Sequence, residues 1–122
     1  MRGLNKVTLI GSITKDVEIQ QLEGNISVAR FALTTTETFK DSKGQVRANI
    51  EQHTIVLWRE LAELAHKHLQ RGSLIFLEGK LKTHWVDDTD GQTHYVTEIM
   101  GEYIVMLDKS NPICMDDLGK FN

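Results

Sequence analysis

The stretch from Gln52 to Trp85 constrains the fold more than any other, because strand, helix and strand follow one another there almost without linkers. Residues 55–58 form a β-branched and aromatic run of strand length. Apolar residues then recur at helical spacing, at Leu61, Leu64, Ala65 and Leu69. Gly72 lies where a left-handed helix stop is expected, and residues 74–77 begin the next strand. A helix between two strands of an otherwise β-rich chain predicts a small barrel closed at one end.

This pattern predicts an all-β OB-fold, a five-stranded Greek-key barrel with one short helix between strands 3 and 4. We expect the other strands at residues 5–14, 26–39 and 93–107, where alternation or threonine-rich β-branched runs occur. Residues 15–25 and 40–49 are expected to be polar connections, each containing turn residues. On the fourth strand, alternation predicts a core-facing set, namely Ile75, Leu77, Gly79, Leu81 and Thr83.

We expect one domain at residues 1–107 and a short flexible C-terminal tail at 108–122, where the strand pattern ends. Apolar residues make up 40% and charged residues 25% of the 122-residue chain, which is typical of a soluble globular protein. No apolar run has the length of a membrane span or a signal peptide. The lone Cys114 excludes an intramolecular disulfide and favours a cytoplasmic location.

The sequence offers no convergent set of catalytic residues, so we expect no enzyme and no cofactor. His84 and His94 flank a turn and can approach each other, but no third metal ligand lies near them in the sequence. We therefore expect no metal site. The net charge of −3 gives nucleic-acid binding no general support, so any such binding requires a local basic face.

Alternation along two neighbouring strands predicts such a face. It places Trp58 beside a set from the next strand, Phe76, Lys80 and Lys82. Lys40, Lys43 and Arg47 add positive charge beside Phe39 in the connection that precedes. Interleaved rings and cations suit an unpaired nucleic acid, because bases stack on rings and lysines contact phosphates. The alternative is ordinary structure, since a strand tryptophan is often a core residue and strand lysines are often simply solvated.

Residues 103–107 are apolar at every position, which predicts that both faces of this strand are covered. A single barrel has no second layer to cover the outer face. A partner subunit that contacts the outer face around Tyr103 is the simplest cover, so we expect an oligomer.

Several short segments of the chain match one known family. The N-terminal Arg2-Gly3-Leu4-Asn5-Lys6-Val7 resembles the signature of bacterial single-stranded DNA-binding proteins, and Thr35-Thr36-Glu37-Thr38-Phe39 resembles the segment before that family's first stacking aromatic. Similar segments follow in the same order: Glu51-Gln52-His53, Leu61-Ala62-Glu63, Gly72-Ser73, Glu78-Gly79-Lys80-Leu81, Asp90-Gly91 and Tyr95-Val96-Thr97-Glu98. The resemblance covers the chain from Arg2 to about Leu107.

The resemblance implies an OB-fold that assembles as a homotetramer and binds single-stranded DNA without sequence preference. Such proteins protect single strands during replication, recombination and repair, in the nucleoid-associated cytoplasm. It implies that Phe39 and Trp58 are stacking aromatics and that His53 lies at a subunit interface. Basic positions along the DNA path correspond to Lys6, Lys43, Arg71 and Lys82.

The sequence departs from the family pattern at four places. Gln52 stands where many members have a stacking tryptophan, and Glu60 replaces a position that is often basic. Trp85 lies one residue before the family's hairpin aromatic, so it either packs on the core side or stacks on bases after a β-bulge. The tail matches only in part the acidic tip through which family members recruit replication and repair proteins, because Lys120 and Asn122 interrupt the match.

Two other functions compete with DNA coating. A relative that uses the same barrel for primosomal replication restart would bind a partner protein more than bare DNA, and the changes at Gln52 and Glu60 fit it. A structural oligomerisation module would have no DNA affinity and would bury Trp58 between subunits.

Overall fold

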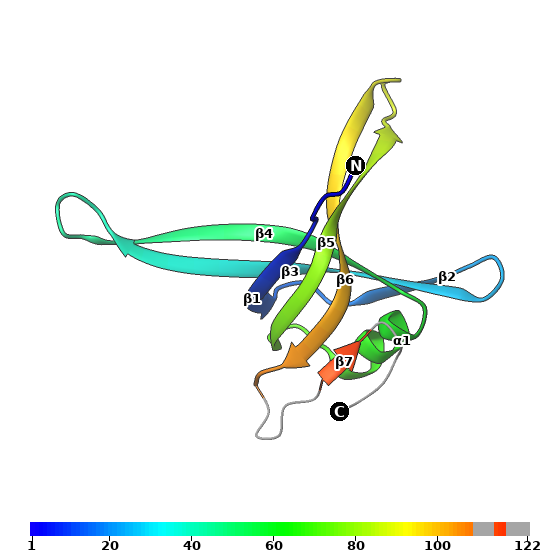
Figure 1. Cartoon of the computed structure of the whole chain (residues 1–122), viewed down its shortest axis with the longest axis horizontal. Helices are drawn as coiled ribbons and strands as arrows, with labels where there is room; N and C mark the ends of the chain where they lie inside the picture. Colours follow the sequence, from blue (N-terminus) through cyan, green and yellow to red (C-terminus); the bar gives the residue numbers. More distant parts are fainter. Residues whose placement is uncertain (109–113, 117–122) are drawn as a thin grey trace.

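Five strands close into a barrel in the computed structural model, which describes residues 1–108 and 114–116 (Figure 1). They are β1 (Val7–Ile13), β3 (Ile26–Lys40), β4 (Val46–Trp58), β5 (Leu74–Asp87) and β6 (Thr93–Met106). The hydrogen-bonded order is β1-β5-β6-β4-β3, and a β1–β3 pairing at Ser12 and Thr34 closes the ring. The helix α1 (Arg59–His68) connects the third and fourth strands of the barrel. The predicted OB-fold is therefore confirmed.

Two short strands were not predicted. β2 (Glu18–Leu22) pairs with β3 inside the segment expected to be a polar connection, and most of its side chains are exposed. Backbone pairing to β3 holds most of it, with one side-chain hydrogen bond from Gln21 to Ser27, so the apolar pattern gave little signal. β7 (Cys114–Asp116) pairs with β6 within the predicted tail. The remaining tail residues, 109–113 and 117–122, lie outside the described part, and the flexible tail stays a prediction.

The barrel interior is filled by alternate residues of the strands, such as Leu33, Ile55 and Leu77, which are fully buried. Helix α1 closes one end of the barrel and buries one face, with Leu61 and Ala65 in the core cluster. The predicted stopper helix is thus confirmed.

The backbone explains why glycine occupies two positions, Gly11 and Gly72. A Cβ on Gly11 would lie 2.3 Å from the carbonyl oxygen of Thr34, so only glycine lets β1 cross β3 so closely. Gly72 has a φ of +96° and donates its N–H to the Ile13 carbonyl at 2.8 Å. It belongs to the turn before β5, because α1 already ends at His68. The interpretation of Gly72 as the helix stop was therefore wrong.

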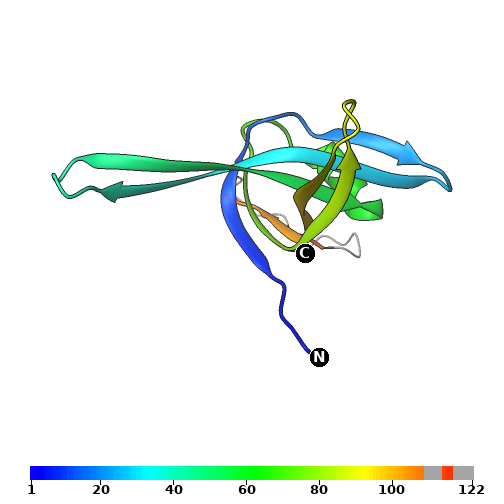
Figure 2. The ribbon, with the colours of Figure 1, turned by 90° about the horizontal axis from the view of Figure 1, so that it is seen from above.

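The β3–β4 and β5–β6 hairpins extend beyond the barrel, as Figures 1 and 2 show. The β3–β4 hairpin, here called the long arm, pairs without interruption out to Lys40 and Val46. The β5–β6 hairpin, here called the short arm, pairs out to Asp87 and Thr93. Because the short arm leaves the barrel, Leu81 is 47% exposed and Thr83 is exposed as well. The prediction that these two residues face the core was wrong.

Candidate nucleic-acid interface

Trp58 ends β4 and caps α1, and its side chain lies outside the core with 42% of the residue exposed. Its β3 partner is Val28. The neighbouring Leu57 is fully buried, as the predicted alternation requires. The structure of the single chain therefore places the Trp58 ring at the surface, in contact with solvent.

A groove of about 280 Å³ runs beside this ring, and we call it the Trp58 groove. Its lining residues come from β3, β4, β5 and β6: Arg30, Val56, Trp58, Lys82, Thr83, His84, Glu98 and Met100. The structure thus brings together Trp58 and Lys82, two of the predicted binding residues. Lys80 pairs with Met100 on the adjacent strand and is half-buried next to the groove.

A second hollow of about 250 Å³ continues the surface along β3 and β4. Gln52 and Thr54 line it, as does Lys15 from the β1–β2 connection. Arg30 lines both hollows and so lies where they meet. An extended polymer can pass from Trp58 over Arg30 toward Gln52 without leaving this face of the sheet.

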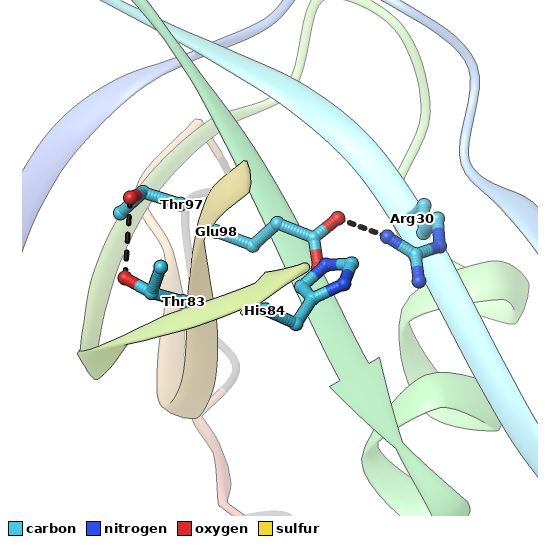
Figure 3. A network of polar contacts seen from close by, with 5 residues as sticks. All are labelled: Arg30, Thr83, His84, Thr97 and Glu98. Atoms are coloured by element: carbon cyan, nitrogen blue, oxygen red, sulfur yellow. Dashed lines mark hydrogen bonds and ion pairs between the residues drawn. The ribbon is translucent and has the colours of Figure 1, made fainter. Parts of the chain in front are cut away.

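Three of the residues that line the Trp58 groove, Arg30, His84 and Glu98, form a polar network (Figure 3). The Glu98 side chain is almost completely buried, and its Oε2 accepts from Nη1 of Arg30. The other oxygen, Oε1, lies 2.8 Å from Nε2 of His84. Arg30 and His84 come from β3 and β5, so one β6 carboxylate ties three strands together. On the short arm nearby, the hydroxyl groups of Thr83 and Thr97 are 3.2 Å apart.

Phe39 lies on the long arm, with Arg47 as its strand partner and 52% of the residue exposed. The Arg47 guanidinium donates to the Asp41 carboxylate at 3.0 Å at the arm tip. With the backbone N–H groups of Gln45 and Lys43, it holds the pKa of Asp41 below its ordinary value of 3.8.

The ammonium groups of Lys40 and Lys43 on the long arm, and of Lys80 and Lys82 on β5, form no ion pair within residues 1–108. A cation that has no carboxylate partner can contact a phosphate without first giving up an ion pair. The predicted phosphate-binding roles of these four lysines are therefore compatible with the structure.

Trp85 stacks on Tyr95, its partner across the short arm, with ring centroids 3.7 Å apart and planes at 39°. The two residues are 60% and 65% exposed, so neither ring packs in the core. The register shift of this strand pair lies between Glu78 and Gly79, nearer the start of β5, and not at Trp85. Tyr95 was not among the predicted site residues, although its position opposite Trp85 across the predicted turn was a usable signal.

Lys6 and Arg71 lie away from the Trp58 groove. Lys6 is 3.5 Å from Glu78, and Arg71 is 3.5 Å from Asp16 in the connection after β1. Phe76 does not line the groove either, because its ring packs edge-on against Tyr103 at 6.3 Å. The prediction that Phe76 shares a binding face with Trp58, Lys80 and Lys82 was therefore wrong, because Phe76 lies outside the groove near the start of β5.

Arg59, which follows Trp58, was missed by the sequence interpretation. It is exposed and has a φ of +59°, a left-handed conformation that residues other than glycine rarely adopt. Within the described part of the chain its guanidinium has no ion-pair partner. Arg30 was also missed, although its alternation with Ala29 and Phe31 on β3 placed it outside the core.

His53 is half-buried on β4, and its Nε2 lies 3.0 Å from the Thr35 hydroxyl. Tyr103 is half-buried on the outer face of β6. The predicted roles of these two residues in subunit contact stay predictions. Among residues 1–108 and 114–116 no group of three or more potential metal ligands occurs, and no helix there is long and apolar enough to cross a membrane.

Comparison with known proteins gives consistent matches. The profile of the Single-strand binding protein family matches residues 4–107. The curated relative "Single-stranded DNA-binding protein 1" of Chlorobaculum tepidum is 41% identical over 107 residues. The match covers 87% of this chain and 66% of that relative, so this chain spans slightly less than two thirds of the relative's length.

Two solved structures share the fold. A Plasmodium falciparum SSB in complex with ssDNA superposes with a TM-score of 0.81 at 29% identity, covering 88% of this chain and 98% of that chain. A deletion mutant of the single-stranded DNA binding protein from Thermus aquaticus gives a TM-score of 0.77, also at 29% identity. That match covers 93% of this chain and 58% of the other.

Proposed function

The chain belongs to the single-strand binding protein family, and from this membership we propose that it binds single-stranded DNA without sequence preference. In this role it would cover strands exposed during replication, recombination and repair, in the nucleoid-associated cytoplasm. Binding rather than catalysis is the proposed activity.

The observation that carries the proposal is the exposed Trp58 ring beside Lys82 in one groove. A base can stack on the ring while the ammonium group contacts a phosphate, and neither contact selects a particular base. The continuation of the groove past Arg30 toward Gln52 gives the strand a path along β3 and β4.

The long and short arms add further contacts. Phe39, Lys40 and Lys43 present a ring and two cations on the long arm, and the Trp85–Tyr95 pair presents a stacked aromatic surface on the short arm. The exposed rings on both arms give apolar surfaces on which a base can stack. We propose Phe39 and Trp85 as additional stacking positions, and Lys6 and Arg71 as weaker phosphate contacts.

A homotetramer is the proposed assembly. The outer face of β1, β5 and β6 carries apolar side chains in register: Ile10 opposite Phe76, and Phe76 opposite Val105. Ile10 is 56% exposed in the single chain. A second subunit would cover this face, with Tyr103 beside it and His53 at a separate contact.

An electrophoretic shift with a thymidine oligomer tests the proposal, with duplex of the same length as a control. We expect binding of the single strand at 50 mM salt, much weaker binding at 200 mM, and little binding of the duplex. Retention of the duplex or of forked DNA in preference to the single strand would favour replication restart. A tetramer with no DNA affinity at either salt concentration would instead indicate an oligomerisation module.

A further inference from the structure

Glu98 is the one carboxylate among the residues that line the Trp58 groove. Its position is unexpected for a surface that is proposed to bind a polyanion. Only 8% of the residue is exposed, and both carboxylate oxygens are occupied, one by Arg30 and the other by His84. Figure 3 shows the carboxylate between these two side chains.

The partners of Glu98 include the best-placed cation of the groove. Arg30 lies where the two hollows meet, and 47% of its side chain is exposed. A strand that passes from Trp58 toward Gln52 therefore crosses the Arg30 guanidinium. An arginine at such a point normally binds phosphate with two parallel hydrogen bonds.

The ion pair changes what Arg30 can offer. The positive charge of Arg30 is balanced by a carboxylate within the same groove, so a phosphate that approaches the guanidinium also approaches Glu98. Because Glu98 is nearly buried and also hydrogen-bonded to His84, it cannot swing away without losing both contacts. Lys82, which pairs with Glu98 across the strands, also lines the groove and carries no ion pair in the described part.

We propose that Glu98 is an internal competitor for DNA phosphate, which withholds Arg30 from the strand and so limits the affinity of the Trp58 groove. The inference rests on the proposed single-stranded DNA binding. The expected effect is that the bound strand makes one phosphate contact fewer than the number of cations along the groove indicates. A protein that must release its strand to other enzymes gains from such a limit, because weaker binding at one contact speeds dissociation.

The variant Glu98→Gln tests the proposal, because glutamine keeps the shape and an oxygen acceptor but removes the charge. The measurement is the affinity for a thymidine oligomer as a function of salt concentration. We expect the slope of log affinity against log salt to steepen by about 0.7, the value for one additional phosphate contact on a single strand. At 0.1 M salt this corresponds to binding tighter by about fivefold.

Glu23→Gln is the matched control, because it makes the same change in net charge. Glu23 is exposed in the turn between β2 and β3, outside the groove. We expect this variant to leave the slope unchanged. If both variants steepened the slope equally, net charge alone would explain the effect and the proposal would be wrong.

Arg30→Gln completes a double-mutant cycle, and the result for this single variant does not depend on the folding of Glu98→Gln. In the otherwise unchanged protein it is expected to leave the slope as it is, because Arg30 makes no phosphate contact there. In the Glu98→Gln background it is expected to abolish the gain. A flatter slope for Arg30→Gln alone would show that Arg30 already binds phosphate, with Glu98 as its positioning residue, and would overturn the proposal.

Failure of this inference and failure of the proposed function give different results. If the unchanged protein binds the oligomer but Glu98→Gln does not steepen its slope, only the inference fails. If the unchanged protein shows no binding at 50 mM salt, the proposed function fails and the inference fails with it.

Discussion

Phe39 and Trp58 project from opposite faces of one uninterrupted two-stranded ribbon. The β3–β4 register runs without a bulge from Val28 opposite Trp58 to Lys40 opposite Val46. Trp58 and Arg47, the partner of Phe39, lie an odd number of positions apart along β4, so their side chains lie on opposite faces of the ribbon. The two positions lie about 35 Å apart along the strand, at roughly 3.3 Å per residue. A nucleic acid that stacks on both rings must pass around an edge of the long arm, so this geometry favours wrapping over straight binding.

Because Phe39 and Trp58 are far apart, we expect the losses of binding free energy from their replacement to be additive. We expect Phe39→Ala and Trp58→Ala each to lower affinity for a long thymidine oligomer by about 1–3 kcal/mol, the usual contribution of one stacked base. The double variant should lose the sum of the two values, because the sites share no partner. Isothermal titration at fixed salt measures all three. A loss in the double variant no larger than in either single variant would show that the two rings act as one site.

The Trp85–Tyr95 pair is expected to stabilise the short arm locally. Cross-strand aromatic pairs contribute about 0.5–1.5 kcal/mol beyond area burial, and both rings lie outside the core. Tyr95→Ala should therefore speed amide exchange in residues 82–98 while the global melting temperature changes by less than about 4 °C. Hydrogen exchange followed by mass spectrometry measures this. Unchanged exchange in the arm would contradict a stabilising role for the pair.

Arg59 is expected to lower the stability of the fold. A non-glycine residue in the left-handed region costs about 1–2 kcal/mol. Replacement by glycine removes this strain, but glycine loses more conformational entropy on folding, which offsets about 0.5–1 kcal/mol of the gain. Arg59→Gly should therefore raise the free energy of unfolding by up to about 1.5 kcal/mol in a urea titration. Arg59→Ala, which keeps the strain, is the control and should give no gain. Equal stability of the two variants would mean that the cost of the left-handed backbone at Arg59 is no larger than the glycine offset, which would contradict the expectation.

The tips of both arms are expected to lose order in acid. Hydrogen bonds from Arg47 and from the Gln45 backbone lower the pKa of Asp41, and the Gln92 backbone N–H and the His94 side chain lower the pKa of Asp88. A carboxyl whose folded-state pKa lies below its ordinary 3.8 contributes stability that is complete above about pH 4. This contribution is lost as the pH falls through the lowered folded-state pKa.

Carboxyl and amide NMR shifts at the two tips measure this transition. Asp41→Asn should reproduce the acid form of the long-arm tip at neutral pH while it leaves the short-arm tip unchanged. An Asp41 carboxyl that titrates at or above its ordinary pKa would contradict the expectation.

The barrel was predictable from the sequence because its strands and helix each bury one face. Leu57 and Leu77 alternate with outward residues on their strands, and α1 presents one apolar stripe. The same rule failed for Leu81, because alternation does not show where a hairpin leaves the barrel and both its faces meet solvent. It also failed for β2, where backbone pairing to β3 needs no apolar side chains.

The candidate site was only partly predictable for a different reason. Trp58 and Lys82 were found because each residue alone has a chemistry that suits nucleic acid. The Arg30–Glu98 pair could not be found, since it joins β3 to β6 and only the closed barrel brings the two residues together. The strain at Arg59 is a backbone property, and no spacing in the sequence indicates it.

Tryptophan fluorescence gives the most direct test of the central proposal, that an unpaired strand stacks on the ring of Trp58. The chain has two tryptophans, so Trp85→Phe leaves Trp58 as the only one and keeps an aromatic ring opposite Tyr95. Titration of this variant with a thymidine oligomer at 50 mM salt should quench the emission, and added salt should reverse the quenching. Binding of the oligomer with unchanged Trp58 emission would contradict the proposal.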